Sequence, residues 1–140
     1  PYVEKLCYLD LDLYHYFIGR EGQSVNESVM MKRIDQQLKV TKIIMDCVDL
    51  STVKSRKLER YLERFLSIML AVSSIHLLMI GDSLAMKKRR AMWRYLEQKD
   101  PALYRRMRHS VGGFTYLPSK LGNRLSLAGY RLAKKVVKFQ

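Results

Sequence analysis

The chain has 140 residues, 48% of them hydrophobic, with 26 basic and 13 acidic side chains that give a formal net charge of +13. This length and apolar content fit one globular domain, or a piece of a larger protein, and exclude extended disorder. Only three prolines and seven glycines interrupt the sequence, which favours helices over a β-sandwich or barrel.

The first predicted element is a strand over residues 9–18, which read LDLDLYHYFI. Leucines alternate there with Asp10 and Asp12, and a glycine-containing turn ends the segment. No later segment predicts a strand as strongly, so the edges of this one need a partner. That partner is a missing part of the protein, the short segment that follows, or another copy of the chain. Since the first residue is Pro1 and not Met, we expect a longer gene product.

From Asn26 onward the sequence predicts a bundle of about five helices, so the fold class is mainly α with an N-terminal strand or hairpin. Cap residues begin these helices: Asn26, Asp82 or Ser83, Asp100 before Pro101, and Ser119. Gly81 offers an end to the longest one. The predicted helices cover residues 26–48, 52–80, 83–98, 101–109 and 119–139, and the Gly112-Gly113 pair predicts a loop over 111–118.

One run without charges, residues 65–81, is apolar and lies in the longest predicted helix. It is slightly shorter than the ~20 apolar residues of a membrane-spanning helix, and it contains three serines and His76. We therefore predict a buried central helix, in which His76 is a hydrogen-bonded core histidine and not a ligand.

The last predicted helix carries a continuous apolar stripe made of Leu121, Leu125, Ala128, Leu132, Val136 and Phe139. Basic residues at 124, 131, 135 and 138 lie beside it. This pattern fits a helix on an anionic membrane surface, and equally a helix packed on a core with a wetted basic flank.

The positive charge is concentrated in the later part of the chain. Residues 1–50 hold six basic and eight acidic side chains, whereas residues 51–140 hold twenty and five. Such an excess favours anionic lipid, phosphate or nucleic acid. Trp93, Tyr95 and Tyr104 lie among these charges and could stack on bases, but no nucleic-acid-binding motif supports nucleic acid as the partner. The candidate anion-facing residues are Lys87, Lys88, Arg89, Arg90, Arg105, Arg106, Arg108, Arg131, Lys135 and Lys138.

Metal chemistry has little support in the residues. Asp10-Leu11-Asp12 matches the short DxD pattern of metal-dependent nucleotide-sugar enzymes, but a half-buried strand has the same alternation. His15, between two tyrosines, fits a metal or oxyanion contact, or a hydrogen bond among aromatic residues. Cys7 and Cys47 form no CxxC pair, so no metal site is predicted and a reducing, cytoplasmic compartment fits best.

A polar turn follows the predicted strand and contains Arg20, Gln23 and Ser24 between and after two glycines. Glycine lets the backbone approach a ligand, arginine offers a fork for phosphate, and the neutral side chains add donors. An ordinary polar turn before a helix cap has the same composition.

Residues 14–25, which read YHYFIGREGQSV, resemble the closing strand and loop of bacterial family 2 glycosyltransferases. Residues 34–40 (IDQQLKV), 99–108 (KDPALYRRMR) and 125–139 (LSLAGYRLAKKVVKF) resemble the helical C-terminal extension of members that build cell-surface polysaccharides. The resemblance implies that residues 1–25 end a truncated GT-A catalytic domain and that residues 26–140 form a helical C-terminal domain.

The resemblance also implies a function for the parent enzyme. Such enzymes transfer a sugar from a nucleotide-sugar donor, usually with Mn or Mg, and their metal motif and catalytic base lie upstream of this kind of tail. By resemblance, Arg20, Gln23, Ser24 and His15 would lie near the donor diphosphate. The chain itself would hold no catalytic residue and no cofactor. It would act in association, acceptor positioning or docking at the inner face of the membrane, as a homodimer through the strand edge or the helices. The alternative is a non-enzymatic helical protein that binds nucleic acid.

Overall fold

The structure, a computed structural model, describes residues 5–12, 14, 26–117 and 119–136, and it is mainly helical, as predicted. No strand occurs in these residues. Seven α-helices and one 3-10 helix do: α1 Glu27–Lys32, α2 Ile34–Cys47, η1 Leu50–Thr52, α3 Arg56–Ile80, α4 Ser83–Lys99, α5 Pro101–Arg108, α6 Val111–Phe114 and α7 Ser119–Val136.

Most predicted helix ends are confirmed by their caps. The side chains of Asn26, Asp82 and Asp100 accept hydrogen bonds from backbone N–H groups two or three residues later, at 3.2, 2.6 and 2.8 Å. Gly81 ends α3 with a φ of 75°. Local chemistry therefore determines where these helices begin and end.

Three predicted boundaries are wrong. The helix expected over 52–80 begins only at Arg56, after the separate 3-10 helix η1. The helix expected over 26–48 is interrupted at Arg33, which separates α1 from α2. The loop expected over 111–118 contains α6, because Gly112 lets this short helix pack directly on α3. The Gly112 N–H donates to the Ser67 hydroxyl at 3.0 Å, and a β-carbon at Gly112 would lie 3.2 Å from the Ser67 carbonyl oxygen.

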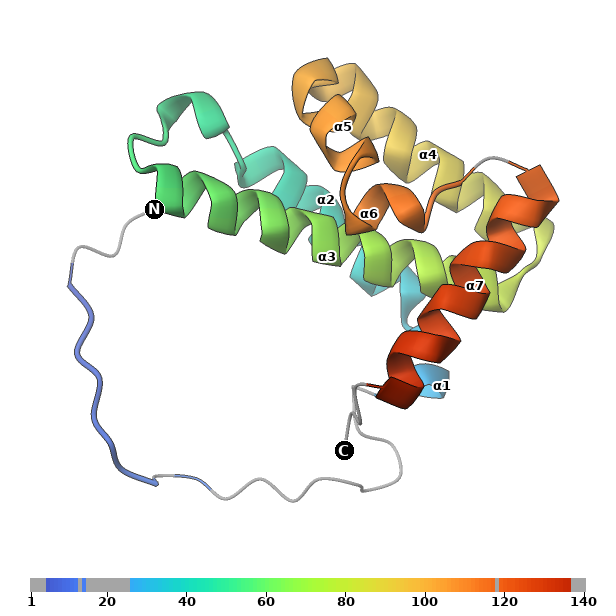
Figure 1. Ribbon diagram of the computed structural model, residues 1–140, viewed down its shortest axis with the longest axis horizontal. Helices are drawn as coiled ribbons and strands as arrows, with labels where there is room; N and C mark the ends of the chain where they lie inside the picture. The colour runs from blue at the N-terminus through green and yellow to red at the C-terminus, as the bar shows by residue number, and fades with distance from the viewer. Residues whose placement is uncertain (1–4, 13, 15–25, 118, 137–140) are drawn as a thin grey trace.

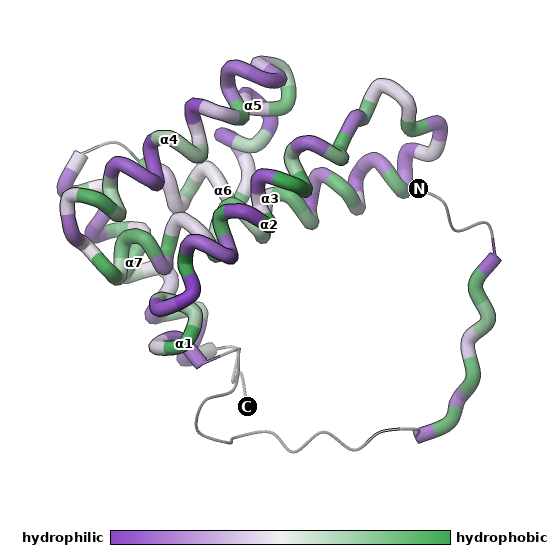
Figure 2. The backbone as a smooth tube through the Cα atoms, turned by 180° about the vertical axis from the view of Figure 1, so that it is seen from behind, coloured by the Kyte–Doolittle hydropathy of each residue, from purple (hydrophilic) through white to green (hydrophobic). Residues whose placement is uncertain are grey.

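Helix α3 lies at the centre of the bundle (Figure 1). It contacts α1, α2, α4, α6 and α7. Helices α6 and α7 lie on the side of α3 that faces the viewer in Figure 1, and α2 lies on the opposite side (Figure 2). Among the helices of the described part, α3 alone is long and apolar enough to cross a membrane, but 56% of its most apolar window is buried inside the protein.

The core forms around Trp93 of α4, which is fully buried. Its indole N–H donates to Ser74 Oγ at 3.0 Å, and its ring stacks on Tyr116 with centroids 4.7 Å apart. The buried residues packed in the same cluster are Met45, Val48, Leu66, Leu70, Met92, Leu96, Leu103 and Met107. Trp93 is therefore no platform for stacking nucleic-acid bases.

The predicted strand is not seen where the structure describes it. Residues 9–12 and Tyr14 are exposed and adopt no regular secondary structure, and the blue segment of Figure 1 is extended. Residues 13 and 15–18 of this prediction lie outside the described residues, as does most of the domain predicted over 1–25.

We expect Leu70→Ala to lower the free energy of unfolding by about 2–5 kcal/mol, because it empties a fully buried position on α3. Chemical denaturation measures this change. Ile68→Ala on the same helix is the control, since Ile68 is about half exposed and should cost far less. Equal losses for the two variants would contradict the burial described here.

Candidate membrane-facing site

Helix α7 combines an unbalanced charge with an unusual choice of buried residues. No acidic side chain occurs after Asp100 in the sequence. Between its ends α7 carries Lys120, Arg124, Arg131, Lys134 and Lys135. The structure shows which face of this helix is used to hold it in the fold and which is left outside.

Small residues make close contacts between α7 and the rest of the fold. Gly122 and Ser126 are buried, and Ser126 Oγ lies 2.9 Å from the carbonyl oxygens of both Gly122 and Phe114. A β-carbon at Gly129 would come within 2.9 Å of the Phe114 ring, so the absence of a side chain lets α7 pack against α6. Small residues thus attach α7 to the fold at short range.

A carboxylate on α1 holds the second half of α7. Glu27 Oε1 accepts hydrogen bonds from Tyr130 Oη at 2.6 Å and from Lys134 Nζ at 2.7 Å. These bonds, that of Lys134 first, hold the pKa of Glu27 below its ordinary value. Burial and the bond to Glu27 raise the pKa of Tyr130 to about 12. The Glu27 clasp, as we name these three residues, is therefore formed with Glu27 ionised.

The Glu27 clasp makes stability depend on pH. A lowered pKa in the folded state means that its stabilisation is fully present above the ordinary carboxyl pKa and is lost as the pH falls through the folded value. We expect Glu27→Gln to reduce the loss of unfolding free energy on acidification, measured by urea titration at a series of pH values. Asp46 and Asp49 also have lowered pKa values, so the unfolding free energy of both proteins still depends on pH. Identical slopes for the variant and the parent would contradict the clasp.

Arg89 holds the first half of α7 and corrects a prediction, because this residue is buried and not part of an anion-facing surface. It donates to Asn123 Oδ1 of α7 at 2.9 Å and to the Thr115 carbonyl oxygen, and its guanidinium lies 4.9 Å from the centre of the Tyr116 ring. Burial lowers the pKa of Arg89 to about 10, so it remains charged at neutral pH.

We expect Arg89→Lys to destabilise the fold by about 2 kcal/mol, because an ammonium group does not reproduce the planar fork between Asn123 and Thr115. Thermal unfolding measures the loss. The neighbouring Arg90 is exposed, so Arg90→Lys serves as the control and should leave the unfolding temperature unchanged. A stable Arg89→Lys protein would show that the fork is not needed.

The predicted apolar stripe of α7 faces outward. Leu121, Leu125 and Leu132 are 66%, 52% and 65% exposed, and Ala128 between them is also exposed. Arg124, Arg131 and Lys135 form the next row on the helix, each three residues after a member of the stripe: Leu121, Ala128 and Leu132. They are exposed and form no ion pair with any carboxylate of the described residues. The side chains of Val136, Lys138 and Phe139 lie outside the described part.

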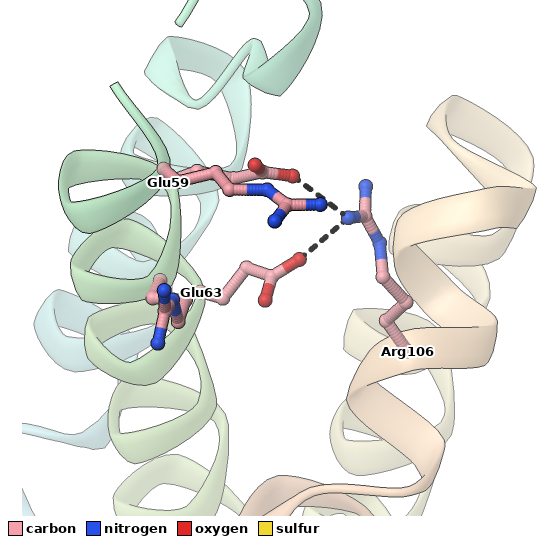
Figure 3. Close-up of a pocket in the computed structure, with 5 residues that line it drawn as sticks. Glu59, Glu63 and Arg106 are labelled. Atoms are coloured by element: carbon pink, nitrogen blue, oxygen red, sulfur yellow. Dashed lines mark hydrogen bonds and ion pairs between the residues drawn. The ribbon is translucent and has the colours of Figure 1, made fainter. Parts of the chain in front are cut away.

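Other predicted anion-facing residues are already engaged. Lys88 pairs with Asp35 at 2.5 Å, and Arg108 donates to the Tyr116 carbonyl oxygen at 2.6 Å. Arg106 bridges two carboxylates of α3, with Nη1 3.2 Å from Glu59 Oε1 and 2.7 Å from Glu63 Oε1 (Figure 3). Lys87, Arg90 and Arg105 are exposed. The basic cluster over 87–108 is thus less available than its sequence indicates.

The residues assigned to the donor diphosphate by resemblance, His15, Arg20, Gln23 and Ser24, lie outside the described residues. Asp10 and Asp12 are described and exposed. Within the described ranges no three His, Cys, Asp or Glu side chains are grouped to hold a metal ion. Cys7 and Cys47 are free and exposed.

His76 of α3 is buried, as predicted, but it is not fully hydrogen-bonded. Its Nδ1 has no partner among the described residues. Burial lowers the pKa of His76, so the imidazole is neutral at pH 7.

Sequence reasoning missed how α7 is held. The clasp joins residues more than a hundred positions apart, and no local pattern indicates such a pair. One signal was present: small residues at 122, 126 and 129 mark a helix face that can approach a neighbour closely. No protein-family model matches this chain, and neither a curated protein nor a solved structure matches it significantly.

Proposed function

We propose that this chain docks on an anionic membrane through α7, with its leucines among the acyl chains and its arginines and lysine among the lipid phosphates. One observation carries the proposal: Leu121, Leu125 and Leu132 are exposed on a helix whose opposite face already attaches it to the fold. A basic row beside such a stripe is the arrangement of a helix that lies in the membrane interface.

The expected binding is reversible. Full burial of a leucine contributes about 1.5–3 kcal/mol, and these leucines are already partly covered. Each basic side chain close to an anionic leaflet adds about 1 kcal/mol, which salt screens. Three leucines and three cations therefore support peripheral association that depends on both lipid charge and ionic strength.

The glycosyltransferase hypothesis supplies the context for this docking. We propose that the parent protein is a bacterial family 2 glycosyltransferase that uses a nucleotide sugar and a cell-surface polysaccharide or similar acceptor. The resemblance of residues 14–25 supports it, with that of the later helical segments. Docking would keep the enzyme at the inner face of the membrane. These 140 residues alone are expected to transfer no sugar, and the Mn or Mg of the family would be held by the catalytic domain.

Co-sedimentation of the 140-residue chain with vesicles tests the docking. We expect binding to vesicles of phosphatidylcholine with phosphatidylglycerol, little binding to phosphatidylcholine alone, and release by salt. Replacing Leu121, Leu125 and Leu132 by serine should abolish binding, since the anchors are lost. Replacing Arg124, Arg131 and Lys135 by glutamine should weaken it at low salt.

A matched control separates α7 from net charge. Glutamine at Lys87, Arg90 and Arg105 removes the same number of exposed charges from α4 and α5 and should leave vesicle binding nearly unchanged. Equal losses for the two charge variants would contradict a site on α7. Strong, salt-dependent binding to DNA without vesicle binding would favour the nucleic-acid alternative instead.

A further inference from the structure

Helix α3 leaves an apolar strip uncovered in its first half. Tyr61, Phe65 and Ile68 are 63%, 38% and 47% exposed, and the rings of Tyr61 and Phe65 stack with centroids 6.3 Å apart. Leu58, one turn earlier, is also exposed. We call Tyr61, Phe65 and Ile68 the α3 strip. Neighbouring exposed apolar side chains of this kind mark a candidate interaction surface.

The α3 strip continues the face of α3 that is covered farther along the helix. Tyr61, Ile68 and Ile75 are seven residues apart and therefore share a face, but Ile75 is only 4% exposed. Helix α7 crosses α3 on the side seen in Figure 1 and contacts it. The strip is thus the uncovered continuation of a face of α3 that is buried inside the protein farther along the helix.

Helix α6 joins the two apolar surfaces. Phe114 of α6 is half exposed, and its ring lies against Gly129 of α7. The neighbouring Gly112 is held by Ser67 of α3, one position before Ile68. Exposed apolar side chains therefore occur on α3, α6 and α7, three helices that contact one another.

The charges along the strip match those of α7. Lys57 and Arg64 alternate with Tyr61 and Ile68 at steps of three and four residues, and both are exposed. Neither forms an ion pair with a carboxylate in the part of the chain that the structure describes. The adjacent carboxylates Glu59 and Glu63 pair with Arg106. The outer face of this half of α3 is thus apolar and cationic, as α7 is.

We propose that the α3 strip is a second contact with the same anionic bilayer, so that α3 lies along the membrane surface and does not cross it. This inference rests on the proposed docking of α7. A two-fold dimer through the strip would bring the Lys57 and Arg64 side chains of two copies together, which like-charge repulsion opposes. Lipid phosphates are the complementary partner, and the tyrosine ring suits the polar boundary of a bilayer.

Environment-sensitive labels test this orientation in the 140-residue chain. With Cys7 and Cys47 replaced by serine, a single cysteine is introduced as Ile68→Cys on α3, Ala128→Cys on α7, or Val40→Cys on the exposed side of α2. Each is labelled with a nitrobenzoxadiazole dye, and anionic vesicles are added. We expect a blue shift, and quenching by brominated lipid, at positions 68 and 128 but not at 40.

The outcomes separate the two proposals. A response at 128 without one at 68 would overturn the second contact and leave the docking of α7 intact. No response at either position would overturn both, and a response at all three would contradict a defined orientation. Ile68→Ser should also weaken vesicle binding by about threefold to tenfold while the stability stays near that of the parent. Unchanged binding would likewise overturn the second contact.

Discussion

The outward surface of α7 depends on how this last helix is attached to the bundle. Small residues and polar contacts hold α7: Gly122, Ser126 and Gly129 bring it close, Arg89 binds its beginning and Glu27 its second half. Leu121, Leu125 and Leu132 lie outside this contact face and stay exposed, whereas Leu127 is half-buried. Their exposure follows from the attachment and is not an accident of loose packing.

The same contacts sort the charges of the protein. Carboxylates occupy the seams between helices, where Glu27 meets α7, Asp35 meets α4, and Glu59 and Glu63 meet α5. These carboxylates pair with Lys134, Lys88 and Arg106, each on a neighbouring helix. The cations left without such partners in the described structure include Arg124, Arg131 and Lys135 of α7, and Lys57 and Arg64 of α3. Part of the net charge of +13 is therefore exposed on α3 and α7 without a paired carboxylate.

Much of the helical architecture follows from the sequence, because helix ends are local: Asp82, Asp100 and Gly81 act within one turn. What the sequence left open depends on distant partners. Periodicity identified the leucine stripe of α7 but gave two interpretations of its direction, and only the contacts with α1 and α6 decide between them. Arg89 and Arg90 belong to the same basic run, so the sequence does not distinguish the buried arginine from the exposed one. Trp93 has charged neighbours in the sequence but lies in the core.

The absence of carboxylates after Asp100 has a consequence for regulation. The outward charge of α7 comes from arginine and lysine alone, because the helix carries no carboxylate between Ser119 and Val136. In the proposed docking, the proportion of anionic lipid in the leaflet would set the attraction of this charge to the membrane. The fraction of protein bound to the membrane would then follow the lipid composition of the bilayer.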